Sequence, residues 1–173
     1  LACGAWLGQT LEPLGFEVDV RPQKGQLRDY FFEGMDTAKL PVLMPEGELD
    51  VIPFAGGKIS VGASHENDQG FDLTVDETVL ASLEEEAKTY FPDLSTAKSF
   101  SERVGTRAYT SDFSPFFGEV PELESVFVAS GLGSSGLTTG PLIGKNLVEL
   151  AMNRPGSLDS ADYPVAQYVK KKD

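Results

Sequence analysis

The chain has 173 residues, the length of about one domain, and 40% of them are hydrophobic, which is enough for a sizeable core. Its formal net charge of −13 disfavours a partner such as nucleic acid or an anionic membrane surface. The single cysteine, Cys3, excludes an internal disulfide, and the single histidine, His65, leaves no residues for a His/Cys zinc site. Since no apolar run reaches membrane-spanning length and no signal peptide is visible, we expect a cytoplasmic protein without an integral membrane segment.

The first half of the chain is rich in strand and turn signals. Residues 1–7 have the pattern of a buried strand running into a glycine turn, and we expect the chain to begin inside a larger protein. Alternating apolar and polar residues predict a strand over 16–21 that continues through a turn or bulge at Gly25. Two apolar segments, 49–54 and 58–63, flank a glycine pair and predict a β-hairpin.

A helix is predicted from residue 77 to Tyr90. Thr74 to Glu77 fits a capping box, apolar residues recur on one face, and Pro92 stops the helix. Residues 97–110 then predict one long strand or two.

A strand, a glycine-rich turn and a helix are predicted near the C-terminus, at 126–129, 131–136 and 137–152. The residues from Ser157 onward are polar, and we expect them to be frayed.

The glycine-rich turn, residues 131–136, spells G-x-G-x-x-G between a strand and a helix. It cannot open a dinucleotide-binding domain, because no second parallel strand follows and only a polar tail comes after the helix. Two interpretations are left. The turn is a structural connector, or its N–H groups and the helix N-terminus face an electron-rich group such as a flavin ring.

Two further residues have both a functional and a structural interpretation. Arg107 lies in a strand-like segment, where its guanidinium can clamp a carboxylate or simply pair with one of the 27 acidic residues. His65 follows a strand and is either a general base or a loop histidine with a hydrogen-bond partner.

Several segments, in order along the chain, resemble the D-amino-acid oxidase and glycine oxidase type of FAD-dependent oxidoreductase. They are residues 2–6 (A-x-G-x-W turn), 21–26 (P-x-R-G-Q strand, with Lys24 for Arg), 57–64 (G-x-x-x-x-G-A-T strand), 105–118 (G-x-R-P-x-T-x-D…P-x-x-G) and 131–140 (the closing G-H-x-x-x-G segment, with Leu132 for His).

The resemblance implies an α+β fold: a mixed, largely antiparallel sheet with flanking helices. It also implies a domain plan. Residues 1–15 would be a remnant of the FAD domain, 16–118 the substrate-binding domain, 119–155 the last strand-turn-helix of the FAD domain, and 156–173 a polar tail. The N-terminal dinucleotide-binding half of the family is absent from this sequence, so we expect this chain alone to carry no FAD.

The resemblance also implies the site. The flavin takes a hydride from the α-carbon of an amine, so no catalytic acid or base and no metal ligand is assigned. Arg107 falls on the arginine that holds the substrate carboxylate, and Asp50 falls near a substrate-contacting tyrosine, where it can favour a cationic amine. The residues expected to bind the cofactor are Cys3, Gly4, Trp6, Gly131, Leu132, Gly133, Ser134, Ser135, Gly136, Leu137 and Thr138.

The leading hypothesis is therefore part of an FAD-dependent oxidoreductase that oxidises a small amine or amino acid. One alternative is a non-enzymatic α+β binding module with a structural glycine-rich turn. Another is a flavin-independent protein that binds a small anion at the helix N-terminus formed by Gly131 to Gly136.

Overall fold

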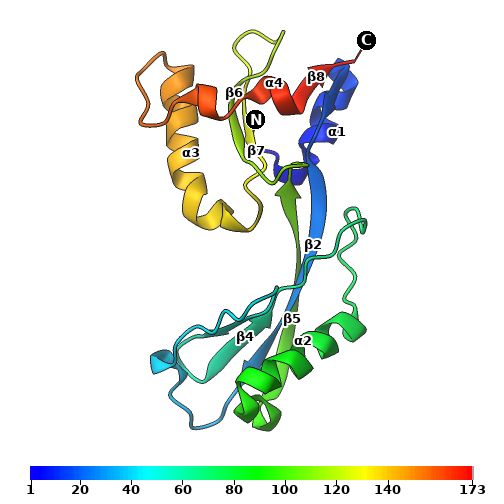
Figure 1. The fold of residues 1–173 in the computed structure, drawn as a ribbon, viewed down its shortest axis with the longest axis vertical. Coiled ribbons are helices and arrows are strands. Elements are labelled where there is room, and N and C mark those ends of the chain that lie inside the picture. The colour runs from blue at the N-terminus through cyan, green and yellow to red at the C-terminus, as the bar shows by residue number, and fades with distance from the viewer. Residues whose placement is uncertain (173) are drawn as a thin grey trace. The chain divides into compact units, whose positions relative to one another are not determined.

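The computed structural model describes residues 1–172, which form two compact units (Figure 1). Unit 1 combines residues 1–23 with the segment from Arg107 onward, and unit 2 is the continuous segment 24–106. The chain passes between the units within two long strands, β2 (Arg21–Phe31) and β5 (Lys98–Tyr109). Antiparallel pairing dominates the described sheets, and four α-helices accompany them, which confirms the expected α+β fold class.

Unit 2 is built on a four-stranded sheet in the order β3–β4–β2–β5. β3 (Asp50–Pro53) and β4 (Lys58–Gly62) form the predicted hairpin, and β4 also pairs antiparallel with β2. The hairpin turn needs glycine at position 57, because its φ is +82° and a Cβ there would lie 2.3 Å from the carbonyl oxygen of Phe32.

Helix α2 (Glu77–Tyr90) covers one face of this sheet (Figure 1). Its packing forms the core of unit 2, which consists of Tyr30, Phe32, Leu49, Val51, Ile59, Val61, Leu83, Ala87 and Leu94. A 3-10 helix at Thr37–Lys39 lies between β2 and β3, and another at Pro92–Thr96 connects α2 to β5.

The N-cap of α2 differs from the predicted capping box. The Asp76 carboxylate accepts the backbone N–H groups of Thr78 at 2.9 Å and Val79 at 3.4 Å. The Thr74 hydroxyl instead donates to Asp72. An aspartate one residue before the helix is the stronger cap, because its ionised oxygen accepts from the exposed N–H groups of the first turn.

Unit 1 contains two small antiparallel sheets. One pairs β1 (Phe16–Val18) with β8 (Val169–Lys171), and the other pairs β6 (Phe116–Glu119) with β7 (Phe127–Ser130). The helical segments are Gly4–Trp6 (3-10), α1 (Leu7–Leu11), Glu12–Leu14 (3-10), Gly133–Ser135 (3-10), α3 (Gly136–Ala151), Ser160–Asp162 (3-10) and α4 (Val165–Tyr168). Its core comprises Leu7, Leu11, Phe16, Phe116, Val120, Val128, Val165, Tyr168 and Val169.

The C-terminal segment corrects one expectation. Residues 158–172 are not frayed: β8 pairs with β1 in a register that places Val169 opposite Val18. The Tyr168 ring stacks on Phe116 with centroids 4.8 Å apart. A few buried apolar side chains among polar neighbours are enough to anchor this segment. The average polarity of the segment hides them, so the sequence suggested a frayed tail. The domain boundaries proposed from the sequence stay predictions.

Candidate functional site

The glycine-rich turn connects β7 to α3 in unit 1, and two of its glycines are required by the protein's own packing. Gly131 has a φ of +76°, and a Cβ there would lie 2.9 Å from the carbonyl oxygen of Ser114. Gly133 has a φ of +54°, and its Cβ would approach the ring of Tyr109 to 2.3 Å. These two glycines therefore need no ligand to explain them.

Gly136, the first residue of α3, is different. Its φ of −56° is helical, and a Cβ there would meet its nearest neighbour, Leu132, at an ordinary 3.5 Å. No side chain caps the N-terminus of α3 at Ser135, whereas α2 has Asp76. Leu137 in the first turn is 96% exposed. The start of this 16-residue helix thus presents backbone N–H groups and positive dipole charge to the surroundings.

Not every N–H group of the turn is available to a ligand. The Ser134 N–H donates to the Tyr109 hydroxyl at 3.1 Å, and the Ser135 N–H donates to the carbonyl of Leu132 at 3.2 Å. Thr138, expected to contact the cofactor, has an exposed side chain whose hydroxyl donates to the carbonyl of Ser135. The positive end of the helix is therefore formed by the amides that follow Ser135.

The structure brings the N-terminal candidate residues to this turn. The Ser130 hydroxyl, at the end of β7, donates to the carbonyl of Gly4 at 3.1 Å, joining segments that are 126 residues apart. Cys3 is half-buried against the core, and Trp6 is 45% exposed. Figure 1 shows the N-terminus beside β6 and β7. Two segments that the resemblance assigns to one cofactor are thus neighbours.

Arg107 and Asp50, the two expected substrate contacts, belong to different units and are described separately. Arg107 lies in β5 at the start of the second part of unit 1, with a half-buried side chain. It precedes Tyr109 by two residues in the strand, so both side chains leave β5 on the same side.

Asp50 in unit 2 lies on the face of the sheet opposite α2. It pairs with Gly62, and the next pair on that face is Ile52 with Ser60. The intervening Val51 belongs to the core beneath α2, which fixes the direction of the alternation. Gly62 has a φ of +146°, and a Cβ there would lie 2.5 Å from the Cβ of Leu27 on β2, so the packing of the neighbouring strand requires this glycine.

The same face holds a buried carboxylate that the sequence reading missed. Asp29 is 2% exposed and accepts hydrogen bonds from Ser60, from Ser101 at 3.0 Å and from Arg103 at 2.9 Å, while the Lys58 ammonium lies 3.1 Å away. Burial by itself raises the pKa of Asp29, but these donors outweigh it and hold the pKa well below its ordinary value. Asp29 is therefore an ionised structural centre whose donors are already committed.

A second carboxylate, Asp112, organises the turn after β5. It accepts the backbone N–H of Ser114 at 3.1 Å and the hydroxyl of Tyr168 at 2.9 Å. These hydrogen bonds, led by the Ser114 N–H, lower the pKa of Asp112. The sequence motif contains Asp112 and Tyr109 but assigns them no role; their proximity to the turn becomes visible only in three dimensions.

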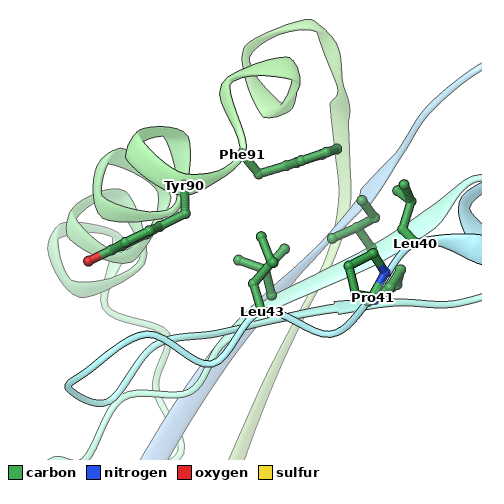
Figure 2. A pocket seen from close by; sticks show the side chains of 8 residues that line it. Leu40, Pro41, Leu43, Tyr90 and Phe91 are labelled. Atoms are coloured by element: carbon green, nitrogen blue, oxygen red, sulfur yellow. The ribbon is translucent and has the colours of Figure 1, made fainter.

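An apolar cavity of about 230 Å³ lies between α2 and the β3–β4 hairpin in unit 2 (Figure 2). It is lined by Leu40, Pro41, Leu43, Val51, Pro53, Ile59, Tyr90 and Phe91. The tyrosine hydroxyl is the one polar side-chain group in this lining. An amino acid carries a carboxylate and an ammonium that need charged or hydrogen-bonding partners, so this cavity does not suit it.

The sequence also led to expectations about His65, metal binding and membrane segments. The imidazole Nδ1 of His65 lies 3.3 Å from the Glu48 carboxylate, within unit 2. Within residues 1–172, His, Cys, Asp and Glu side chains nowhere gather in the groups of three that a metal site needs. No helix in this described part is long and apolar enough to cross a membrane.

Comparisons with known proteins place this geometry in a family. The family described as FAD dependent oxidoreductase (DAO) matches residues 1–150. The uncharacterized oxidoreductase YurR of Bacillus subtilis (strain 168) is 37% identical over 167 residues, which cover 96% of this chain and 45% of YurR. A glycine oxidase of Pseudomonas aeruginosa is 31% identical over 96% of this chain and 44% of its own length.

A solved structure agrees with these relatives. The crystal structure of iminodiacetate oxidase from Chelativorans sp. BNC1 superimposes with a TM-score of 0.90 and 33% identity, over 94% of this chain and 44% of that protein. The chain spans less than half the length of these relatives. It belongs to the DAO family of FAD-dependent oxidoreductases.

Proposed function

We propose that this chain is the part of a flavoenzyme that holds the carboxylate of an amine or amino-acid substrate and contacts the flavin ring. When bound, the flavin accepts a hydride from the carbon next to the substrate nitrogen. The observation that carries the proposal is the uncapped N-terminus of α3, where neither the backbone conformation of Gly136 nor its packing within the protein requires a glycine.

The residues present fit a flavin at this position. The amides at the start of α3 can stabilise negative charge on the pyrimidine end of the ring, because they carry the positive end of the helix dipole. A glycine at position 136 allows a planar ring to approach the backbone closely. The segment of Cys3, Gly4 and Trp6 lies beside the same turn through the Ser130–Gly4 hydrogen bond.

Arg107 is proposed to fix the substrate. A guanidinium offers a planar fork of donors that matches a carboxylate, and a strand holds it more rigidly than a loop. Asp50 is proposed to favour a substrate with a second positive charge, because the family resemblance puts it near a substrate-contacting position and a carboxylate attracts a cation. Neither residue has to move a proton.

The test uses the complete protein that contains this chain. Arg107→Ala should raise KM for a carboxylate substrate by about ten- to a hundredfold, the value of a lost charged hydrogen bond, and should change KM for a carboxylate-free amine little. Arg107→Lys should recover part of the loss, because it keeps the charge but not the fork. Arg154→Ala, an exposed arginine in the same unit, is the matched control.

Equal losses for both substrates would show that Arg107 only supports the fold. A complete protein purified without any flavin absorbance, even after incubation with FAD, would contradict the proposed chemistry itself.

A further inference from the structure

Tyr109 connects the strand that carries Arg107 to the glycine-rich turn. It is the last residue of β5, and its side chain is 9% exposed. Its hydroxyl oxygen accepts the Ser134 N–H at 3.1 Å, and its ring fills the space that a Cβ on Gly133 would occupy. One side chain thus determines the position of two consecutive residues of the turn.

The ring of Tyr109 is itself held in place. Phe113 packs against it edge to face, with centroids 5.2 Å apart, and the Arg21 guanidinium lies 5.5 Å from the centroid of Phe113. The next residue in the chain, Thr110, is fully buried, and its methyl group would be 2.9 Å from a Cβ on Gly131. The chain around Tyr109 therefore supports the turn at Gly131 as well as at Gly133.

The position of Tyr109 in the strand gives this contact a function. Arg107 and Tyr109 are two residues apart, so about 6–7 Å of stiff strand separates the carboxylate clamp from the residue that contacts the turn. Hydride transfer requires the substrate carbon and its acceptor to be aligned closely, and a small displacement of either costs rate. A rigid link between the clamp and the turn supplies that alignment.

We propose that Tyr109 is a positioning residue, which fixes the glycine-rich turn relative to Arg107. By accepting the Ser134 N–H, it also prevents this group from donating to the cofactor. The inference rests on the proposed function, because it takes the turn to face the flavin. Tyr109 itself contacts the turn and transfers nothing.

The experiment is Tyr109→Phe in the complete protein, with three measurements. Amide hydrogen exchange in residues 131–136 should quicken by about three- to tenfold, because one hydrogen bond of the turn is lost while the ring stays. The flavin midpoint potential should become more positive, because the freed Ser134 N–H can stabilise the reduced ring. The kcat should fall while KM stays within about twofold, since Arg107 keeps its place on the strand.

Tyr163→Phe, at a tyrosine that packs against Phe117 in the same unit, is the control and should change none of these values. If Tyr109→Phe does not fold, Gly133→Ala displaces the same contact from the other side and should show the same faster exchange. Unchanged exchange, or a lowered melting temperature with an unchanged potential and unchanged kcat, would overturn the inference. A complete protein that binds no flavin would instead refute the proposed function, while the exchange measurement would still report whether Tyr109 holds the turn.

Discussion

The hydroxyl of Tyr168 donates to the carboxylate of Asp112 at 2.9 Å and so connects the C-terminal segment to the turn that follows β5. The amide of Gln167 donates to the same carboxylate at 3.1 Å. Asp112 in turn accepts the Ser114 N–H, and the Ser114 carbonyl oxygen would lie only 2.9 Å from a Cβ on Gly131. Gln167 and Tyr168 therefore stabilise the turn at Asp112 and Ser114, which in turn packs against the glycine-rich turn at Gly131.

This arrangement predicts a large loss of stability for Tyr168→Ala. Removing a ring that is 4% exposed and stacked on Phe116 should lower the free energy of unfolding by about 3–5 kcal/mol. Tyr168→Phe keeps the stacking and loses only the hydrogen bond to Asp112, at a cost of about 1 kcal/mol. Urea unfolding followed by circular dichroism measures both. An Ala variant as stable as the parent would mean that the segment after Ser157 is only a tail.

The cap of α2 gives a second prediction. Asp76→Ala should lower the free energy of unfolding by about 1 kcal/mol, because two N–H groups of the first turn lose their acceptor. Thr74→Ala should cost clearly less, since the Thr74 hydroxyl bonds only to Asp72 on the surface. Thermal unfolding of the two variants side by side distinguishes the observed cap from the capping box predicted from sequence. A larger loss for Thr74→Ala would favour the capping box.

The elements with a strong local pattern were predictable. The β3–β4 hairpin follows from two apolar segments around a glycine pair, and α2 follows from its apolar periodicity and Pro92. The ordered motifs also led to the correct family, which the match over residues 1–150 confirms. Each of these signals lies within a few neighbouring residues of the sequence.

The sequence could not reveal what depends on contacts between distant residues. The pairing of β8 with β1 joins the two ends of the described chain, and Asp29 gathers donors from β4 and β5. The requirement for Gly133 likewise comes from the ring of Tyr109, which lies 24 residues earlier. A motif could mark that glycine as important but could not say whether a ligand or a side chain excludes the Cβ.

The Asp29 cluster makes stability depend on acid in a defined way. Since the pKa of Asp29 is lowered in the folded state, its contribution is complete above its ordinary value of 3.8 and is lost as pH falls below it. Asp29→Asn should reduce the free energy of unfolding by about 2 kcal/mol at pH 7, because Arg103 and Lys58 lose a buried anion. The gap between variant and parent should stay constant from pH 7 to about 5 and shrink below about 4. Urea titrations at several pH values test this, and a gap that widened in acid would contradict it.

Gly133 and Gly136 provide the sharpest test of what the glycine-rich turn does. Gly133→Ala should destabilise the protein by about 1–3 kcal/mol even without flavin, because its backbone has positive φ and its Cβ would overlap the Tyr109 ring. Gly136→Ala should leave the flavin-free protein as stable as before or slightly more stable, since the site is helical and open to a methyl group.

The same methyl group at position 136 should matter once flavin is present. It would stand between the first amides of α3 and the ring, so flavin affinity or midpoint potential should fall in the complete protein. Flavin titration and redox titration of Gly136→Ala measure this, with Gly144→Ala as the matched control. Gly144 lies further along the same helix, and no other atom comes within 4 Å of a Cβ placed there. Normal flavin affinity and potential in Gly136→Ala would mean that the start of α3 does not face the cofactor, whatever the cost of Gly133→Ala to the fold.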